Sequence, residues 1–200
     1  MSQIRALFAS VVCCLSMAAV LPANAQDSAA QILEKARAQA REIEELRAIL
    51  TGADQNMRLA TFDTMIKSGD EAMRLVAYEA GLASADSVMR AMAFKAAVMN
   101  LDTLHLELAP DPSAPRPIVE ASTAYLAKNG NALLIGLGKR DPAAGTFRSN
   151  SWAGQVSGME FMLNYGGNNA QLTLKDDNAL AGVVRLDKGS TRFLATARLR

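Results

Sequence analysis

The sequence predicts an α+β protein in which an N-terminal helix and a short stack of helices are followed by a small antiparallel β-meander or open barrel. Three observations support this prediction. Strong helix formers fill 28–50, a sixteen-residue repeat runs from Asp54 to about Asn100, and apolar and polar residues alternate in short runs over 146–200. Helical periodicity that gives way to strand periodicity along one chain indicates that helices and strands occupy separate regions.

The first 25 residues have the pattern of a secretory leader. Arg5 supplies the positive start, residues 6–21 are mostly apolar, and residues 23–25 (A-N-A) form an A-x-A cleavage signal. The apolar stretch is shorter than the roughly 20 residues that span a bilayer comfortably. We therefore expect a periplasmic protein that is cleaved after Ala25 and has no integral membrane segment after cleavage; an uncleaved anchor is the alternative.

The composition outside the leader excludes several functional classes. Both cysteines, Cys13 and Cys14, lie in the leader, so the rest of the chain has no disulfide, no thiolate nucleophile and no cysteine metal site. Once Arg5 is removed from the 21 lysines and arginines, 20 remain against 20 aspartates and glutamates. This balance argues against broad electrostatic binding to nucleic acid or to an anionic membrane.

The stretch 28–50 is expected to form one helix, because it is rich in Ala, Glu, Gln, Arg and Leu. A heptad-like stripe along it comprises Ile32, Ala36, Gln39, Ile43, Leu46 and Leu50. Such a stripe is explained by a dimerising coiled coil or by a helix that caps the repeats of its own chain. We favour the cap, because the run is barely three heptads long; a homodimer through 28–50 is the alternative.

The pattern D-x-x-M-R occurs three times at sixteen-residue intervals, beginning at Asp54, Asp70 and Asp86. It predicts three helices of roughly twelve residues that bury their apolar faces by stacking on one another. The repeated positions hold an arginine (Arg58, Arg74, Arg90), an aromatic residue (Phe62, Tyr78, Phe94) and an aliphatic residue (Ile66, Leu82, Val98). Leu59 is expected on the buried face with Phe62 and Ile66, and Leu75 with Tyr78 and Leu82.

Each repeat aspartate is expected to cap a helix N-terminus, where its carboxylate accepts a backbone N–H and suits the positive end of the helix dipole. The arginine four residues later is expected to pair back to that aspartate across one turn. The alternative is that Arg58, Arg74 and Arg90 line a concave anionic-ligand site, which makes them candidate binding residues. The balanced charge of the chain favours pairing.

The segment DQNMRLATFDTMIKSGD (54–70), with its D-x-x-[apolar]-R core, resembles the second helix of a HEAT-type repeat, and so do 69–86 and 85–100. In that family the unit is a helix pair, and Asp and Arg mark one helix of the pair. Here they mark every helix, so the resemblance is to a HEAT-like half-repeat over about 42–100. It implies a small helical stack that mediates interactions with other proteins.

Beyond Asn100 the period changes to that of strands. Leu104, Leu106 and Leu108 alternate with polar residues, a short helix is expected within 118–128, and a strand within 132–138. The last fifty residues read as short strands joined by Gly-, Asn- and Asp-rich turns, which is typical of an antiparallel meander or open barrel. The expected organisation is a leader (1–25), a helical segment (26–101), a linker of mixed strand and helix (102–145) and a β-domain (146–200).

The chain offers few residues for catalysis. His105 is the only histidine, and it lacks the further ligands or partners that a metal site or a triad needs. Gly136–Arg140 departs from a phosphate-binding loop, and Asp176–Asn178 has the composition of a hairpin turn more than that of a calcium site. We therefore expect no enzymatic activity, no catalytic residue, no metal and no cofactor.

Trp152 is the last candidate binding residue. As the only tryptophan it can stack on a saccharide or a small apolar molecule, or anchor the core of a small sheet; the second interpretation is favoured. The function expected from the sequence is that of an exported protein-interaction or scaffold protein of the cell envelope, whose partner is another protein. A ligand-binding module built on the β-domain is the alternative.

Overall fold

The computed structural model describes residues 28–149 and 152–199. The predicted leader lies outside these ranges. The chain divides into two units at residue 38, and every contact discussed below lies within 39–200.

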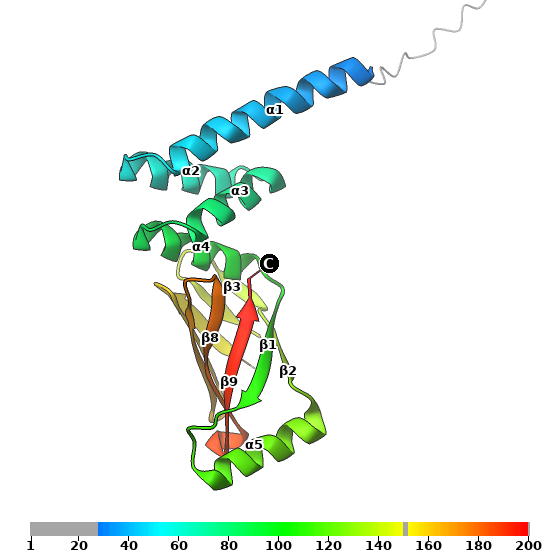
Figure 1. Ribbon diagram of the computed structural model, residues 1–200, viewed down its shortest axis with the longest axis vertical. Helices are drawn as coiled ribbons and strands as arrows, with labels where there is room; N and C mark the ends of the chain where they lie inside the picture. Colours follow the sequence, from blue (N-terminus) through cyan, green and yellow to red (C-terminus); the bar gives the residue numbers. More distant parts are fainter. Residues whose placement is uncertain (1–27, 150–151, 200) are drawn as a thin grey trace, which may run out of the picture. The chain divides into compact units, whose positions relative to one another are not determined.

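The helices of the first half are α1 (Ala29–Leu50), α2 (Gln55–Lys67), α3 (Glu71–Leu82) and α4 (Ser87–Asn100). The three repeats are α2, α3 and α4, drawn in cyan to green in Figure 1. Asp54, Asp70 and Asp86 are their N-caps: each has an extended backbone and accepts backbone N–H groups two or three residues further on. The predicted capping role of all three is confirmed.

Within the part of the chain that the structure describes, no helix is both long and apolar enough to cross a membrane.

Helix α1 buries only the C-terminal end of its stripe. Leu50 is buried and Leu46 packs partly buried against the core, as expected for a helix that caps the repeats. Ile32 and Leu33 are 58 % and 51 % exposed. The homodimer through 28–50 stays a prediction.

Helices α3 and α4 approach each other through small residues. Ala77 and Gly81 of α3 are buried, and a methyl group on Gly81 would lie 2.5 Å from the Cβ of Ala93 in α4. Because this close approach decides which face of α3 packs inward, Leu75 is left 53 % exposed. The prediction that Leu75 faces the core is therefore wrong, whereas Leu82 is buried as expected.

The second half forms one antiparallel sheet with the strand order β2-β1-β9-β8-β7-β6-β5-β4-β3. Its strands are β1 (Thr103–Pro110), β2 (Ala132–Gly136), β3 (Lys139–Asp141), β4 (Thr146–Arg148), β5 (Ala153–Ser157), β6 (Glu160–Tyr165), β7 (Asn168–Leu174), β8 (Ala179–Leu186) and β9 (Thr191–Arg198). A 3-10 turn, η1 (Asp187–Gly189), joins β8 to β9.

The sheet is curled, as its connections require. β2 and β3 lie at opposite edges, yet only Leu137 and Gly138 separate them along the chain. Three residue steps reach about 11 Å at most, whereas nine strands laid flat would place the two edges roughly 38 Å apart. The edges must therefore converge, and Figure 1 shows the curled sheet. The predicted α+β fold, helices followed by an open barrel, is confirmed.

The inner face of the curled sheet carries the apolar residues of the alternating pattern. Phe161 and Phe193 are fully buried, and the rings of Phe147 and Phe161 stack with their centroids 5.5 Å apart. The other buried residues of the sheet include Leu104, Leu106, Leu108, Ile135, Val156, Leu163, Leu172, Leu174, Leu180, Val184 and Leu186. These residues and the buried face of α2–α4 belong to one continuous core.

The segment 102–145 is built into this sheet. It supplies β1, β2 and β3, and helix α5 (Arg116–Asn129), which packs against β9 and β1. The buried Ser122 of α5 accepts the Arg192 N–H at 2.9 Å. The Asp111 carboxylate pairs with the Arg192 side chain at 2.7 Å, and bonds from the Ser113 hydroxyl and N–H, followed by Arg192, lower the pKa of Asp111. Because β1 pairs with β9 in the strand order, this stretch is part of the sheet and is not a separate linker.

Candidate functional site: a cationic groove in the helix stack

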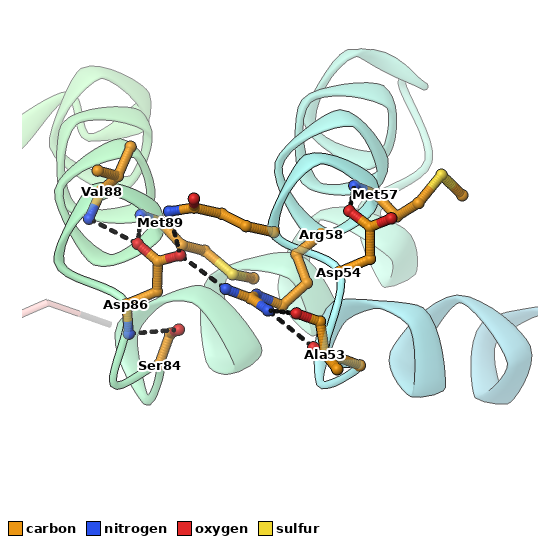
Figure 2. A network of polar contacts seen from close by, with 10 residues as sticks. Ala53, Asp54, Met57, Arg58, Ser84, Asp86, Val88 and Met89 are labelled. Carbon is orange, nitrogen blue, oxygen red and sulfur yellow. Dashed lines mark hydrogen bonds and ion pairs between the residues drawn. The ribbon is translucent and has the colours of Figure 1, made fainter.

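Arg58 joins α2 to the start of α4 (Figure 2). Its Nη1 donates to the carbonyls of Gly52 and Ala53 at 2.8 and 2.9 Å, and its Nη2 donates to Asp86 Oδ2 at 2.8 Å. Gln55 donates to the same carboxylate oxygen at 2.8 Å. The capping aspartate of α4 is therefore held both by its own helix and by α2.

The prediction that each arginine pairs with its own capping aspartate is wrong. Asp54 uses its carboxylate to accept the Met57 N–H at 3.1 Å, and Arg58 reaches past it to Asp86. Side chains on a helix lean toward its N-terminus, so Arg58 extends over the loop before α2 and meets the helix two repeats later. Gln39 and Gln55 show the same rule, since each donates to the aspartate 31 residues later, Asp70 and Asp86.

Arg90 takes a different partner. Its Nη1 donates to Asp176 Oδ1 at 2.9 Å, and its Nη2 donates to the Lys175 carbonyl. Both acceptors lie in the turn between β7 and β8, so the third repeat arginine ties α4 to the sheet. Its side chain is only 14 % exposed.

Arg74 lacks the partner that the repeat would give it. The 28-residue separation of Arg58 from Asp86 would bring Arg74 to Asp102, but Asp102 binds Arg140 instead. Arg140 also donates to the Met99 carbonyl at 3.0 Å and to the Leu137 carbonyl at 2.7 Å. In the described part of the chain Arg74 pairs with Glu71 of its own helix, which raises the pKa of Arg74. Among the described residues its buried Nε has no hydrogen-bond partner.

The side chain of Arg74 lines a groove of about 490 Å³ between α2, α3, α4 and the β3–β4 turn. The lining residues are Phe62, Asp63, Ile66, Lys67, Arg74, Tyr78, Met92, Lys95, Ala96, Met99, Asn100, Pro142 and Ala143. Its floor is apolar, and its rim holds three cations against one carboxylate. Asp63 is paired with Lys67 at 2.7 Å, and Arg74 is paired with Glu71, which does not line the groove. Lys95 therefore gives the groove its positive character.

Tyr78 and Lys95 are each held by the backbone carbonyl of another residue that lines the groove. The Tyr78 hydroxyl lies 3.5 Å from the Ala96 carbonyl of α4, and burial raises the pKa of Tyr78. Lys95 Nζ lies 3.3 Å from the Ala143 carbonyl in the β3–β4 turn. The groove is therefore framed by both the helices and the sheet.

The Asp86 network predicts a pH dependence of stability. The bond from Arg58, followed by those from Gln55 and from the Met89 and Val88 N–H groups, lowers the pKa of Asp86 to about 2. Because the folded pKa lies below the unfolded one, this contribution to stability is complete above about pH 4 and is lost as the pH falls through 2. We expect the Asp86→Asn variant to be less stable than wild type at pH 7 and to lose less stability between pH 4 and pH 2.

Urea denaturation at a series of pH values measures both effects. Arg116→Gln, an exposed change on α5, serves as the control and should keep the wild-type pH profile. An Asp86→Asn variant that loses stability as steeply as wild type between pH 4 and pH 2 would contradict the assignment.

Trp152 lies at the other candidate site, just before β5. It is half-buried and packs against the core, and its ring centroid lies 6.0 Å from that of Tyr165 at the end of β6. Tyr165 is 52 % exposed. Tyr165 is therefore the more exposed ring of the pair, while Trp152 is partly buried against the core. Trp152 and the repeat arginines are not brought together in one site.

The remaining candidates occupy ordinary structural positions. His105 is exposed on β1 opposite Leu134. Asp177 accepts the Ala179 N–H in the β7–β8 turn. In residues 28–149 and 152–199 no group of three or more His, Cys, Asp or Glu side chains is arranged to hold a metal.

Reasoning from sequence missed the groove and its second cation, Lys95. It also missed Arg140, whose partner Asp102 lies 38 residues away. One signal was present: Asp102 keeps the sixteen-residue phase of the capping aspartates without starting a helix. An acidic residue in that phase, followed by a strand, marks the place where the repeat ends. Arg74 is the arginine that then lacks a capping aspartate two repeats later.

Comparison of the chain with protein-family models, with curated proteins and with solved structures finds no match in any of the three.

Proposed function

We propose that this chain is an exported, non-enzymatic protein-interaction or scaffold protein of the cell envelope and that it binds its partner through the helix stack. The observation that carries the proposal is the groove: an apolar floor with a cationic rim, open to solvent on a stack of short helices. Apolar surface supplies binding energy and fixed charges select the partner, which is how protein recognition surfaces are built.

Three further features support this proposal. The leader pattern of residues 1–25 favours export to the periplasm, and the HEAT-like pattern of the repeats favours interaction with proteins. The polar groups on the rim are also largely engaged, Asp63 with Lys67 and Tyr78 with the Ala96 carbonyl. Such groups suit binding better than proton transfer, which needs a base that can reach a substrate.

Site-specific photo-crosslinking of the full chain in the cells that produce it tests the proposal. A photoreactive residue at Ile66, inside the groove, should give a discrete adduct with one periplasmic protein, identified by mass spectrometry and reproduced from the partner's side. The control position is Leu194 on β9, which is 43 % exposed. Adducts from Leu194 alone, or the same set of adducts from both positions, would rule out the stack as the binding surface.

The Trp152–Tyr165 pair favours a second candidate function, a site for a saccharide or a small apolar molecule on the sheet. Aromatic side chains with one exposed face stack on sugar rings and on apolar ligands. Trp152 fluorescence should then shift when cell-wall oligosaccharides are added, and the ligand should protect it from iodide quenching. A Trp152 signal that ignores these ligands would remove this candidate.

A further inference from the structure

We infer that the groove binds an acidic, apolar peptide segment of the partner, whose carboxylate is bound by Arg74 and Lys95 on the rim. This inference rests on the proposed function and specifies the chemistry of the partner. Its basis is a comparison of equivalent arginines within one repeat.

The first step is the rule that the repeat follows. Arg58 bridges two carbonyls of the preceding loop and the carboxylate of the helix two repeats later, with all three distances between 2.8 and 2.9 Å. This arrangement satisfies the planar guanidinium with several charge-assisted or carbonyl bonds. Arg58 therefore shows which groups an arginine at this repeat position binds when a helix with a capping aspartate lies two repeats later.

Arg74 does not have this arrangement. The next helix is replaced by β1, and the aspartate in the matching position, Asp102, is taken by Arg140. Arg74 retains Glu71, whose side chain is 63 % exposed, as its ion-pair partner. An exposed pair of this kind adds little to stability, so the carboxylate of a partner can replace Glu71 on Arg74.

The charges around Arg74 also favour an acidic partner. Lys95 lies on the same rim, and its Nζ is 3.3 Å from the carbonyl of Ala143. Lys67 is paired with Asp63 and Arg74 with the exposed Glu71, so Lys95 is the rim cation that has no ion pair among the described residues. An acidic partner segment complements this rim, whereas a basic one is repelled.

The floor of the groove is apolar. Phe62, Ile66, Met92 and Met99 line it, and methionine side chains adapt their shape to different apolar partners. The groove is open to solvent, which suits the side chains of a peptide better than a lipid chain, because a lipid chain needs an enclosed apolar slot. A planar guanidinium also matches a carboxylate in a bidentate geometry. Together these features favour a peptide with one carboxylate next to apolar residues.

The test uses the full chain, purified after expression with its leader, and a phage-displayed library of random dodecapeptides. Peptides selected on the wild-type protein should share an aspartate or glutamate next to apolar residues. Their affinity, measured by fluorescence anisotropy, should fall about 10- to 100-fold for Arg74→Gln. Arg116→Gln removes an arginine from the exposed surface of α5 and should bind as wild type does.

A second measurement separates a carboxylate contact from a general loss of structure. Replacing the peptide carboxylate by its amide should weaken binding to wild type by a similar factor and should have little further effect on Arg74→Gln. Should Arg74→Gln fail to fold, Lys95→Gln serves instead and should lower the affinity for the same peptides. Selected peptides without an acidic residue, equal binding by Arg74→Gln, displacement by inorganic phosphate, or failure to select any peptide would each overturn the inference.

The two proposals can fail separately. A crosslinked envelope partner that binds Arg74→Gln as tightly as wild type would overturn the inference and leave the proposed function standing. Acidic peptides that need Arg74, without any envelope partner at Ile66, would support the inference and overturn the proposed function.

Discussion

Replacing Phe94 with alanine is expected to lower the free energy of unfolding by about 3–5 kcal/mol. Phe94 lies in α4 and is fully buried, and α4 contacts α2, α3 and β5. Loss of the ring removes apolar contacts and leaves a cavity that the close-packed surroundings fill only in part. Chemical denaturation followed by far-ultraviolet circular dichroism and by Trp152 fluorescence measures the change.

The two signals should shift together, because the helix stack and the sheet share one core. The control is Leu75→Ala on α3, where the side chain is 53 % exposed; a change within about 0.5 kcal/mol is expected. A Phe94→Ala variant in which the helical signal is lost at lower denaturant while the Trp152 transition stays unchanged would show that the core is not continuous.

Replacing Gly182 with alanine is expected to cost about 3 kcal/mol, at the upper end for overpacking. A Cβ at this position in β8 would lie 2.1 Å from the Gln171 carbonyl oxygen and 2.8 Å from the Leu172 Cα in β7. Both obstacles are backbone atoms, so no side-chain rotation relieves the clash. The strands must separate, and the central β7–β8 pair loses hydrogen-bond geometry.

Gly136→Ala is the matched control. Gly136 also lies in a strand, at the end of β2, but an added Cβ there would meet nothing within 4 Å. Its stability should stay within about 0.5 kcal/mol of wild type. Equal effects of the two substitutions on the denaturation midpoint would mean that β7 and β8 are not packed as closely as described.

The elements that depend on local chemistry were the ones predictable from sequence. Asp54, Asp70 and Asp86 cap helices because a carboxylate satisfies backbone N–H groups two or three residues away, and that information lies within one turn of chain. The alternation along β6 to β9 predicted the buried face, since side chains on a strand point alternately to its two sides. The change from helices to strands near Thr103 follows from the same periodicities.

The features that depend on distant partners were not predictable. Arg58 and Asp86 are 28 residues apart and Arg90 and Asp176 are 86 residues apart, so spacing within one repeat does not reveal these pairs. Leu75 is exposed because Gly81 lets α3 approach α4 closely, a consequence of how two helices pack. Arg140 and Asp102 are likewise 38 residues apart, so the spacing within one repeat does not reveal this pair either.

The short connection between β2 and β3 has a consequence for how this chain behaves among other proteins. An open sheet has two edges whose unpaired N–H and C=O groups invite strands from other chains, which is a route to aggregation. Here both edges converge where Leu137 and Gly138 join them, and β3 is only three residues long. Where these two residues join them, the edges lie within about 11 Å of each other, and the connection itself obstructs a strand that would add there. The curl therefore limits strand addition at this end of the sheet as well as enclosing its core.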